Sequence, residues 1–343
     1  MKKIAITTII SVNFGNRLQN YALQQTLEQM GYSAFTLRRT GKDKNIKARI
    51  KAIVQAVLQT KGAKFKQFNN NIHFANEVVT RDAYPSNIKN IYDYFIVGSD
   101  QVWNPHYNFV AGKCDFLDFA NNRQKISYAA SFGVSEIPDE RKKEYAEYLN
   151  TFKAISVREK QGAKIVRKLT NRNAEIVLDP TMLLDAEDWK KIERKSNCKP
   201  EHKYIFVYAL GEKNERFKSK IDQLCKDYDV FDIKAVQKNG KELPVGPSEF
   251  IYLLRNSEIV LTDSFHAAVF SLIFHKRFIV FNRTGLNMNS RVESLAELVD
   301  ESNRINECGD FDCEKEIDYQ KTDTILKRER KKSIEFLNAA LSD

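Results

Sequence analysis

Short apolar runs alternate with amphipathic stretches along this chain, and this alternation constrains the fold more than any other feature of the sequence. The apolar runs predict strands at Lys3–Ile10, Ala34–Arg38, Tyr94–Gly98, Lys125–Ala130, Ala154–Val157, Glu175–Leu178, Tyr204–Tyr208, Val230–Ile233, Glu258–Leu261 and Arg277–Phe281. The stretches between them predict helices at Asn16–Met30, Asp139–Phe152, Lys160–Leu169, Glu187–Lys195, Asn214–Tyr228, Ser248–Asn256, Phe265–His275 and Ser290–Leu298. Strands that alternate with helices form parallel sheets with helices on both faces, so we expect an α/β fold.

The length of 343 residues exceeds what one hydrophobic core usually serves, and it predicts two domains. The polar stretch 195–203 follows the helix expected around Trp189 and is the preferred boundary. We therefore expect a first domain at residues 1–195 and a second at 196–317. A long charged helix, expected over 318–343, would pack back on the first domain.

The chain carries a net charge of +10, which favours anionic partners such as nucleic acid, acidic lipid surfaces or phosphorylated small molecules. Much of the excess lies in Lys42–Lys66 and in 327–332, where a solvated helix face is the simpler interpretation. No nucleic-acid-binding motif, and no basic strand with interleaved aromatic residues, accompanies the charge. We therefore expect no nucleic-acid partner.

Cysteine usage and hydropathy indicate a cytoplasmic protein. The five cysteines form no CxxC pair and have no histidine at ligand spacing, so we expect reduced thiols and no metal site, with a Cys308–Cys313 bridge as the alternative. The apolar start of the sequence imitates a signal peptide, but polar residues follow it closely and no cleavage site is visible. No apolar run reaches the length that spans a membrane.

The stretch 258–274 predicts a buried strand that breaks and enters an apolar helix capped by Asp263 or Ser264. Ligands of open parallel sheets bind beyond the carboxyl ends of the strands, and a helix N-terminus suits an anion. His266 falls in the first turn of this helix, where it is a candidate proton donor. A histidine that merely completes the helix start is the alternative. Arg291 begins a later helix and would be a second anion clamp beside His266.

Polar residues also crowd the start of the first predicted helix. Gly15 permits a tight turn from strand to helix and a close approach to a ligand. Asn13, Asn16 and Gln19 bring carboxamides to this helix opening, although amides favour caps over helix interiors. The pattern is not a GxGxxG fingerprint, so a dinucleotide site is not indicated. Amides that only cap the turn are the alternative.

A polar and aromatic loop follows the strand expected at Tyr94–Gly98. Trp103 in this loop would stack on a sugar ring, while Asp100, Gln101 and Asn104 would bind sugar hydroxyls. The alternative is a tryptophan packed against the sheet, with Asp100 capping a turn.

Two further strand ends contribute Ser131 and Arg158. Ser131 follows the strand Lys125–Ala130 and would also face the ligand. Arg158 lies one residue past its strand, where a guanidinium would grip a carboxylate or a phosphate. An ion pair with Glu159 or another local acid is the alternative.

Taken together, these segments resemble the polysaccharide pyruvyl transferase family, over roughly residues 4–298. The matching pieces are NFGNRLQNYALQ at 13–24, GSDQVWNP at 98–105, SYAASFG at 127–133, SVRE at 156–159, VLDPTMLL at 177–184 and TDSFHAAVFSLI at 262–273. The resemblance implies two Rossmann-like lobes in a GT-B-like arrangement with a cleft between them. It also implies transfer of pyruvate from phosphoenolpyruvate to two hydroxyls of a sugar, which forms a cyclic ketal and releases phosphate during surface or exopolysaccharide synthesis.

The resemblance assigns roles to particular residues. The family's histidine falls on His266, as general acid and base, and its donor-gripping arginine falls on Arg158. Many members carry a second arginine two positions before the histidine, where this chain has Ser264, and we expect Arg291 to supply the missing charge. The second domain would then hold the donor, and the residues of the first domain named above would hold the acceptor. Phosphoenolpyruvate is implied as a substrate, with no cofactor and no metal.

Other functions remain compatible with the sequence. One is a glycosyltransferase of the same two-lobed shape that uses a nucleotide-sugar. Another is a catalytically silent sugar-binding protein, an alternative that Ser264 keeps open. The sequence does not identify the acceptor. If the acceptor is a lipid-linked oligosaccharide, the basic Lys42–Lys66 region would rest on an anionic membrane surface at the inner face of the membrane.

Overall fold

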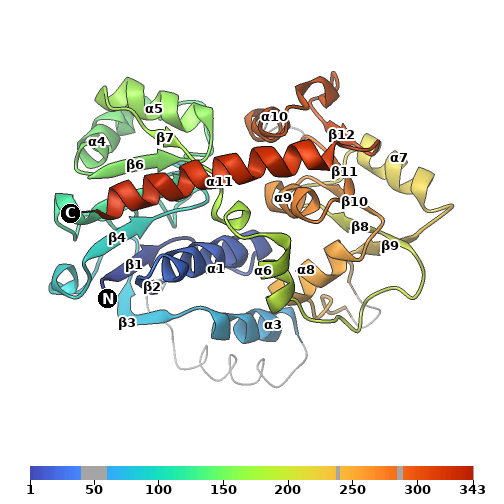
Figure 1. Ribbon diagram of the computed structural model, residues 1–343, viewed down its shortest axis with the longest axis horizontal. Helices are drawn as coiled ribbons and strands as arrows, with labels where there is room; N and C mark the ends of the chain where they lie inside the picture. Colours follow the sequence, from blue (N-terminus) through green and yellow to red (C-terminus); the bar gives the residue numbers. More distant parts are fainter. Residues whose placement is uncertain (40–59, 237–239, 284–288, 343) are drawn as a thin grey trace. The chain divides into compact units, whose positions relative to one another are not determined.

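The computed structural model describes residues 1–39, 60–236, 240–283 and 289–342, with side chains from residue 292 onward in the last range (Figure 1). The chain forms two compact units. Among the described residues, unit 1 comprises 1–39, 69–183 and 329–342, and unit 2 comprises 60–68 and 184–328. Most of the basic segment Lys42–Lys66 lies outside the described residues.

Unit 1 is built on a parallel sheet. Its strands are β1 (Lys3–Thr7), β2 (Ser33–Arg39), β3 (Phe74–Val79), β4 (Tyr94–Val97), β5 (Lys125–Ala130), β6 (Ala154–Val157) and β7 (Glu175–Ile176). They lie in the order β3-β2-β1-β4-β5-β6-β7, and every pair is parallel. The order therefore reverses between β1 and β4, as it does in Rossmann folds.

Helices cover both faces of this sheet. On one face lies α1 (Phe14–Gln29), whose Gln19 and Asn20 donate hydrogen bonds to Thr8 and Thr36. On the other face, α4 (Asp139–Asn150) and α5 (Lys160–Thr170) share a hydrophobic core with β1 and β4. In this core, their residues Tyr145 and Val166 are fully buried.

Unit 2 repeats the architecture on a smaller scale. Its strands are β8 (Tyr204–Tyr208), β9 (Asp229–Asp232), β10 (Ile259–Thr262), β11 (Arg277–Val280) and β12 (Phe311–Cys313), in the order β12-β11-β10-β8-β9. Only the edge strand β12 pairs in antiparallel fashion among the described strands. Its helices are α3 (Lys61–Phe68), α6 (Ala186–Ile192), α7 (Glu215–Leu224), α8 (Pro247–Arg255), α9 (Phe265–Ile273) and α10 (Asn289–Leu298). Here the strand order reverses between β8 and β10.

The last helix, α11 (Tyr319–Leu341), contributes residues to both units. In unit 2, Tyr319 stacks on His275 with ring centroids 4.4 Å apart. In unit 1, Ser333 Oγ accepts a hydrogen bond from the backbone N–H of Leu178. The chain enters unit 2 at Leu184, ahead of the boundary expected at residue 195, because Trp189 of α6 is fully buried and packs edge-on against Phe270 of α9.

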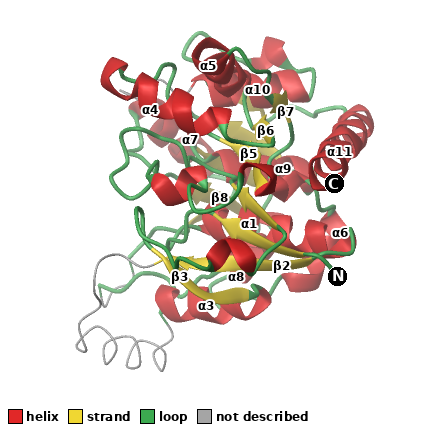
Figure 2. Cartoon of the chain, turned by 90° about the vertical axis from the view of Figure 1, so that its left-hand side faces the viewer, coloured by secondary structure: helices red, strands yellow, loops and turns green. Residues whose placement is uncertain are grey.

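The predicted α/β class, with two Rossmann-like lobes, is confirmed. Figure 2 shows the strands in yellow, largely surrounded by the helices in red. The strand pattern missed β3 and β12, and the helix pattern missed α3. Within the described part of the chain, no helix combines the length and the apolar character that a membrane span requires.

Candidate functional site

Both sheets reverse their strand order once, and each reversal gathers polar side chains. Ligands of open α/β sheets bind outside the carboxyl ends of the strands at such a reversal. In unit 1 the reversal lies between β1 and β4, and in unit 2 between β8 and β10. We call the two sets of polar residues the unit 1 cluster and the unit 2 cluster.

The unit 1 cluster begins at the start of α1. Asn13 caps this helix, because its Oδ1 accepts a hydrogen bond from Asn16 N at 3.3 Å. Asn16 Nδ2 donates to Asp100 Oδ2. Gln19 is fully buried and spans the reversal: its Nε2 donates to Thr8 Oγ1 at 2.8 Å, and its Oε1 accepts from Ser99 N at 3.1 Å. The predicted carboxamides therefore do more than cap a turn, since they join the end of β1 to the end of β4. Gly15 lies buried in the same first turn.

The loop after β4 is held by close backbone packing. Gly98 has a φ of 119°, and a Cβ there would lie 2.2 Å from the carbonyl oxygen of Tyr128. Only glycine meets both conditions. The next turn aims Asp100 toward α1, and the backbone O of Asp100 accepts from Ser131 N at 2.9 Å. This loop therefore positions Asp100 and Ser131 next to each other.

Arg158 lies among three carboxylates. Its Nη1 donates to Asp179 at 3.3 Å and its Nε to Glu159 at 3.4 Å, while its side chain is only 4% exposed. Burial alone would lower the pKa of Arg158, but Glu159, Asp179 and Asp100 outweigh that effect and raise the pKa above its usual value. Arg158 is therefore a fixed cation whose position is set by the acids around it.

The remaining acceptor candidates form a second ring of contacts. Ser131 Oγ donates to Glu159 Oε1 at 2.7 Å, which links Ser131 to the acids of Arg158. Asn104 Nδ2 donates to Gln101 Oε1 at 2.6 Å, and both side chains pack against Gly133. The structure thus brings Asn13, Asn16, Gln19, Asp100, Ser131 and Arg158 into one connected network, with Gln101 and Asn104 beside it.

Trp103 does not have the place expected for a sugar-binding ring. The side chain is fully buried, its ring stacks on Phe116 at 5.7 Å between centroids, and its Nε1 donates to Asp115 O at 2.9 Å. The loop turns its indole inward because the apolar surface beneath the sheet can cover it there. Trp103 therefore packs in the hydrophobic core, and the prediction that it stacks on a sugar ring is wrong.

We expect Trp103→Phe to leave the KM for any sugar acceptor unchanged. The same variant should lose about 1–2 kcal/mol of unfolding free energy, because the Asp115 carbonyl loses its donor and a small cavity opens. Acceptor titrations and urea unfolding measure the two effects. A rise in acceptor KM without loss of stability would contradict the core role.

The unit 2 cluster surrounds the start of α9. Ser264 caps this helix, with its Oγ 3.5 Å from Ala267 N, and Ser264 N itself donates to Thr262 Oγ1 at 2.9 Å. His266 is the second residue of the helix and is 8% exposed. Its ring lies edge-on to Phe265 at 5.5 Å between centroids. The imidazole is therefore largely buried at the positive end of a helix.

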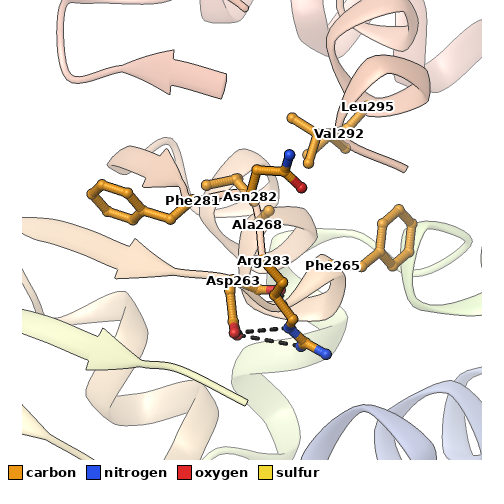
Figure 3. Close-up of a pocket in the computed structure, with 9 residues that line it drawn as sticks. Asp263, Phe265, Ala268, Phe281, Asn282, Arg283, Val292 and Leu295 are labelled. Atoms are coloured by element: carbon orange, nitrogen blue, oxygen red, sulfur yellow. Dashed lines mark hydrogen bonds and ion pairs between the residues drawn. The ribbon is translucent and has the colours of Figure 1, made fainter. Parts of the chain in front are cut away.

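Asp263 organises the backbone around this helix start. Its carboxylate accepts from Leu210 N at 2.6 Å and Gly211 N at 2.8 Å, which fixes the end of β8 beside the end of β10. Arg283 Nε donates to the same carboxylate at 2.8 Å. Arg283 also lines a pocket of about 330 Å³, counting the space open to solvent, together with Phe265, Phe281 and Val292 (Figure 3). The guanidinium of Arg283 therefore lies next to the start of α9, beside the apolar residues that line the pocket.

The sequence did not indicate Arg283 or Asp179 as partners of the site. Arg283 lies a few residues beyond β11, and only the fold brings it to Asp263. Asp179 caps the turn at Thr181, whose backbone N–H donates to Asp179 Oδ1 at 3.0 Å, and Asp179 Oδ2 also accepts from Ser99 Oγ at 2.8 Å and from Arg158. Arg291 lies in the first turn of α10, and its side chain is outside the described part. The predicted role of Arg291 stays a prediction.

The chemistry of the two clusters is that of hydrogen bonding, fixed charge and proton transfer. Over the described ranges, no group of three or more His, Cys, Asp or Glu side chains is arranged to hold a metal ion. The unit 1 cluster offers amides, carboxylates and a hydroxyl, which suit a polyhydroxyl ligand. The unit 2 cluster offers an imidazole, helix N–H groups and a guanidinium, which suit an anion.

Comparison with known proteins gives a family and a fold. A family model described as polysaccharide pyruvyl transferase matches residues 13–285. Among curated proteins, none matches the chain. The UDP-GlcNAc 2-epimerase of Neisseria meningitidis, in a structure bound to UDP-GlcNAc, is 12% identical with a TM-score of 0.50, over 99% of this chain and 100% of that one. The UDP-GlcNAc 2-epimerase of Methanocaldococcus jannaschii is 14% identical with a TM-score of 0.51, over 95% and 99% of the two chains. At such identities the similarity establishes a shared GT-B-like fold and nothing about ligands.

Proposed function

Because this chain belongs to the polysaccharide pyruvyl transferase family, we propose that it transfers pyruvate from phosphoenolpyruvate to two hydroxyls of one sugar during surface or exopolysaccharide synthesis. The observation that carries this proposal is the family match together with the place of His266. This histidine lies in the first turn of α9, at the carboxyl end of β10. It is the proposed general acid and base.

The unit 2 cluster supports phosphoenolpyruvate as the donor. This donor carries a carboxylate, a phosphate and a small apolar methylene group. The N–H groups at the start of α9 and the Arg283 guanidinium suit its anionic groups. Phe265 and Val292 line the pocket beside Arg283, whereas the Phe281 ring stacks on Phe217 and His266 is not among the lining residues. We therefore propose that the methylene lies toward His266, at the edge of this pocket. Arg283 stands beside Ser264, the position where many family members carry an arginine, so we propose that Arg283 supplies that positive charge.

The proposed reaction balances in atoms and charge. His266 as imidazolium gives a proton to the methylene carbon of the donor, and positive charge develops on the adjacent carbon. A first sugar hydroxyl attacks that carbon, and its proton returns to His266. The bond from this carbon to the phosphate oxygen breaks, the second hydroxyl attacks, and its proton leaves with the phosphate. The products are a ketal that carries a methyl and a carboxylate group, and inorganic phosphate.

The unit 1 cluster supports a polyhydroxyl acceptor. Asp100 and Asn16 offer acceptors and donors within one network, whereas Ser131 is fully buried and donates to Glu159, so it does not face the ligand as expected. Asp179 and Glu159 hold the guanidinium of Arg158 in place, and we propose that this fixed cation binds a carboxylate or a phosphate. A lipid-linked oligosaccharide stays part of this proposal, as does contact of Lys42–Lys66 with an anionic membrane. Loss of vesicle binding when these lysines are neutralised is the test of that contact.

The test of the reaction is phosphate release from phosphoenolpyruvate in the presence of sugar acceptors. We expect release that depends on the acceptor, together with a gain of mass on the sugar that corresponds to pyruvate with loss of water. Reactions without acceptor serve as the control for simple hydrolysis. Failure across a broad acceptor panel, together with thermal stabilisation by a nucleotide-sugar but not by phosphoenolpyruvate, would favour a glycosyltransferase instead.

A further inference from the structure

Two aromatic side chains stand exposed on a loop of unit 1 that has no role so far. Tyr107 is 38% exposed and Phe109 is 56% exposed. Their rings are stacked, with centroids 5.3 Å apart and planes inclined by 12°. A contiguous exposed aromatic surface commonly marks a binding site.

The loop that carries these rings is held rigidly by arginines. Arg141 Nη2 donates to Ala111 O at 2.8 Å and its Nη1 to Pro105 O at 3.4 Å. Arg39 Nη2 donates to Phe109 O at 3.0 Å. Arg81 Nε donates to Val110 O at 3.2 Å. The backbone is thus fixed on both sides of the rings, and their exposure is a built feature of the loop.

The position of the loop connects it to the unit 1 cluster. Asn104, one of the acceptor candidates, directly precedes the loop, and Asn104 Oδ1 accepts from His106 N at 2.9 Å. Arg39, which holds Phe109, ends β2. The rings therefore lie at the carboxyl edge of the sheet, the edge where ligands of such sheets bind. The exposed polar residues His106 and Asn108 alternate with the two rings along the chain.

The described contacts of the loop favour a neutral ligand over an acidic membrane, while most of the basic segment Lys42–Lys66, which follows Arg39, lies outside the described residues. Each arginine that holds the loop is paired with an acid: Arg39 with Asp115, Arg81 with Asp82 and Arg141 with Glu144. Anionic bilayers attract clusters of about four to eight uncompensated basic residues, which this loop does not offer among its described contacts. A stable protein partner would need about 1,000 Å² of buried surface, far more than two side chains provide. A pyranose, in contrast, has one face of C–H bonds that packs on an aromatic ring and a rim of hydroxyls.

We propose that Tyr107 and Phe109 form a stacking platform for a sugar ring of the acceptor other than the ring that is pyruvylated. This inference rests on the proposed function, and it makes the acceptor an oligosaccharide. The platform binds the apolar face of a neighbouring sugar unit, while His106 and Asn108 are placed to bind hydroxyls at its rim.

The test compares acceptors of different length. The probes are galactose, glucose and N-acetylglucosamine with their β-linked disaccharides and tetrasaccharides. We expect the wild-type protein to show a kcat/KM about tenfold higher for the tetrasaccharide of the accepted series than for its monosaccharide, the factor that one aromatic contact typically provides. In the double variant Tyr107→Ala, Phe109→Ala this preference should vanish, with kcat/KM for the monosaccharide unchanged.

Two controls separate stacking from other effects. The double variant Tyr107→Phe, Phe109→Tyr keeps both rings and should keep the preference for the longer acceptor. Val78→Ala removes an unrelated exposed apolar side chain from β3, at 43% exposure, and should change nothing. All three variants should unfold at the wild-type temperature, because the changed side chains are exposed.

The possible failures are distinguishable. If the wild-type protein releases no phosphate with any acceptor, the proposed function fails, and calorimetric titration with the tetrasaccharides still tests the platform through loss of binding in the double alanine variant. An unchanged length preference in that variant overturns the platform. Wild-type binding that does not depend on the length of the oligosaccharide also overturns the platform. In another outcome, the double alanine variant loses binding to vesicles of phosphatidylcholine and phosphatidylglycerol in equal parts while it keeps the preference for longer sugars. That result would identify the two rings as a membrane contact and overturn the sugar platform.

Discussion

Replacement of His266 by alanine is expected to lower kcat for phosphoenolpyruvate-dependent phosphate release by about 10²–10⁴-fold, the range that general acid–base catalysis supplies. The loss should fall on kcat, with little change in KM for phosphoenolpyruvate, because the proposed contacts to the donor's charges come from other groups. Initial rates of phosphate release over a donor titration measure both constants. Retention of more than a tenth of the wild-type kcat would show that another group donates the proton.

A second histidine near the same helix provides a matched control. His275 follows α9, is exposed, and pairs with Asp323 at 3.0 Å. Its φ is 52°, a conformation that asparagine tolerates better than alanine, so His275→Asn is the suitable change. This variant should turn over at the wild-type rate. Matching melting temperatures for wild type and both variants would show that the loss in His266→Ala is chemical.

Asp179→Ala is expected to lower the free energy of unfolding by about 3 kcal/mol, the low end of the range for a broken buried ion pair. The Asp179 carboxylate is fully buried and accepts from Ser99 Oγ, from Arg158 Nη1 and from both the N–H and the hydroxyl of Thr181. The expected loss stays at the low end because Glu159 still compensates the charge of Arg158. Urea unfolding followed by tryptophan fluorescence measures the change.

Asp185 offers the control for this prediction. Like Asp179 it caps a helix, with its Oδ1 accepting from Asp188 N at 2.9 Å, but it is exposed. Asp185→Ala should therefore cost only about 1 kcal/mol, the usual value for a lost cap. Equal losses in the two variants would mean that the buried network around Arg158 adds nothing beyond capping.

The strands that are buried on both sides followed most directly from the sequence, although the exposed edge strands β7 and β9 were also predicted. A central strand such as β10 has every residue buried, so it appears as a continuous apolar run. The missed strand β3 lies at a sheet edge and is only partly covered, with Ala75 and Val79 buried but Asn76 and Val78 exposed. The missed strand β12 is an edge strand too and exposes Asp312. The missed helix α3 buries only Phe65 and Phe68, which is too small an apolar face to stand out in the sequence.

The sequence predicted those residues of the candidate site that directly follow a strand. His266, Arg158 and Asp100 were found because polar residues follow apolar runs. Their partners could not be found in this way, since Asp179 meets Ser99 across 80 positions of sequence. The direction of Trp103 was also out of reach, because residue type indicates an aromatic contact but the local turn decides whether that contact is a ligand or the core.

The bridging role of Gln19 limits how this part of the chain can change during evolution. Its amide gives a hydrogen to Thr8 and receives one from the Ser99 amide, at the seam between two halves of the sheet that are sequentially distant. Glutamate has the same shape but no hydrogen to give, and methionine has neither function. Replacement of Gln19 by glutamate changes only one atom of the side chain, an oxygen for a nitrogen, but it removes the donor to Thr8. We therefore expect Gln19 to change only together with Thr8 or the loop at Ser99.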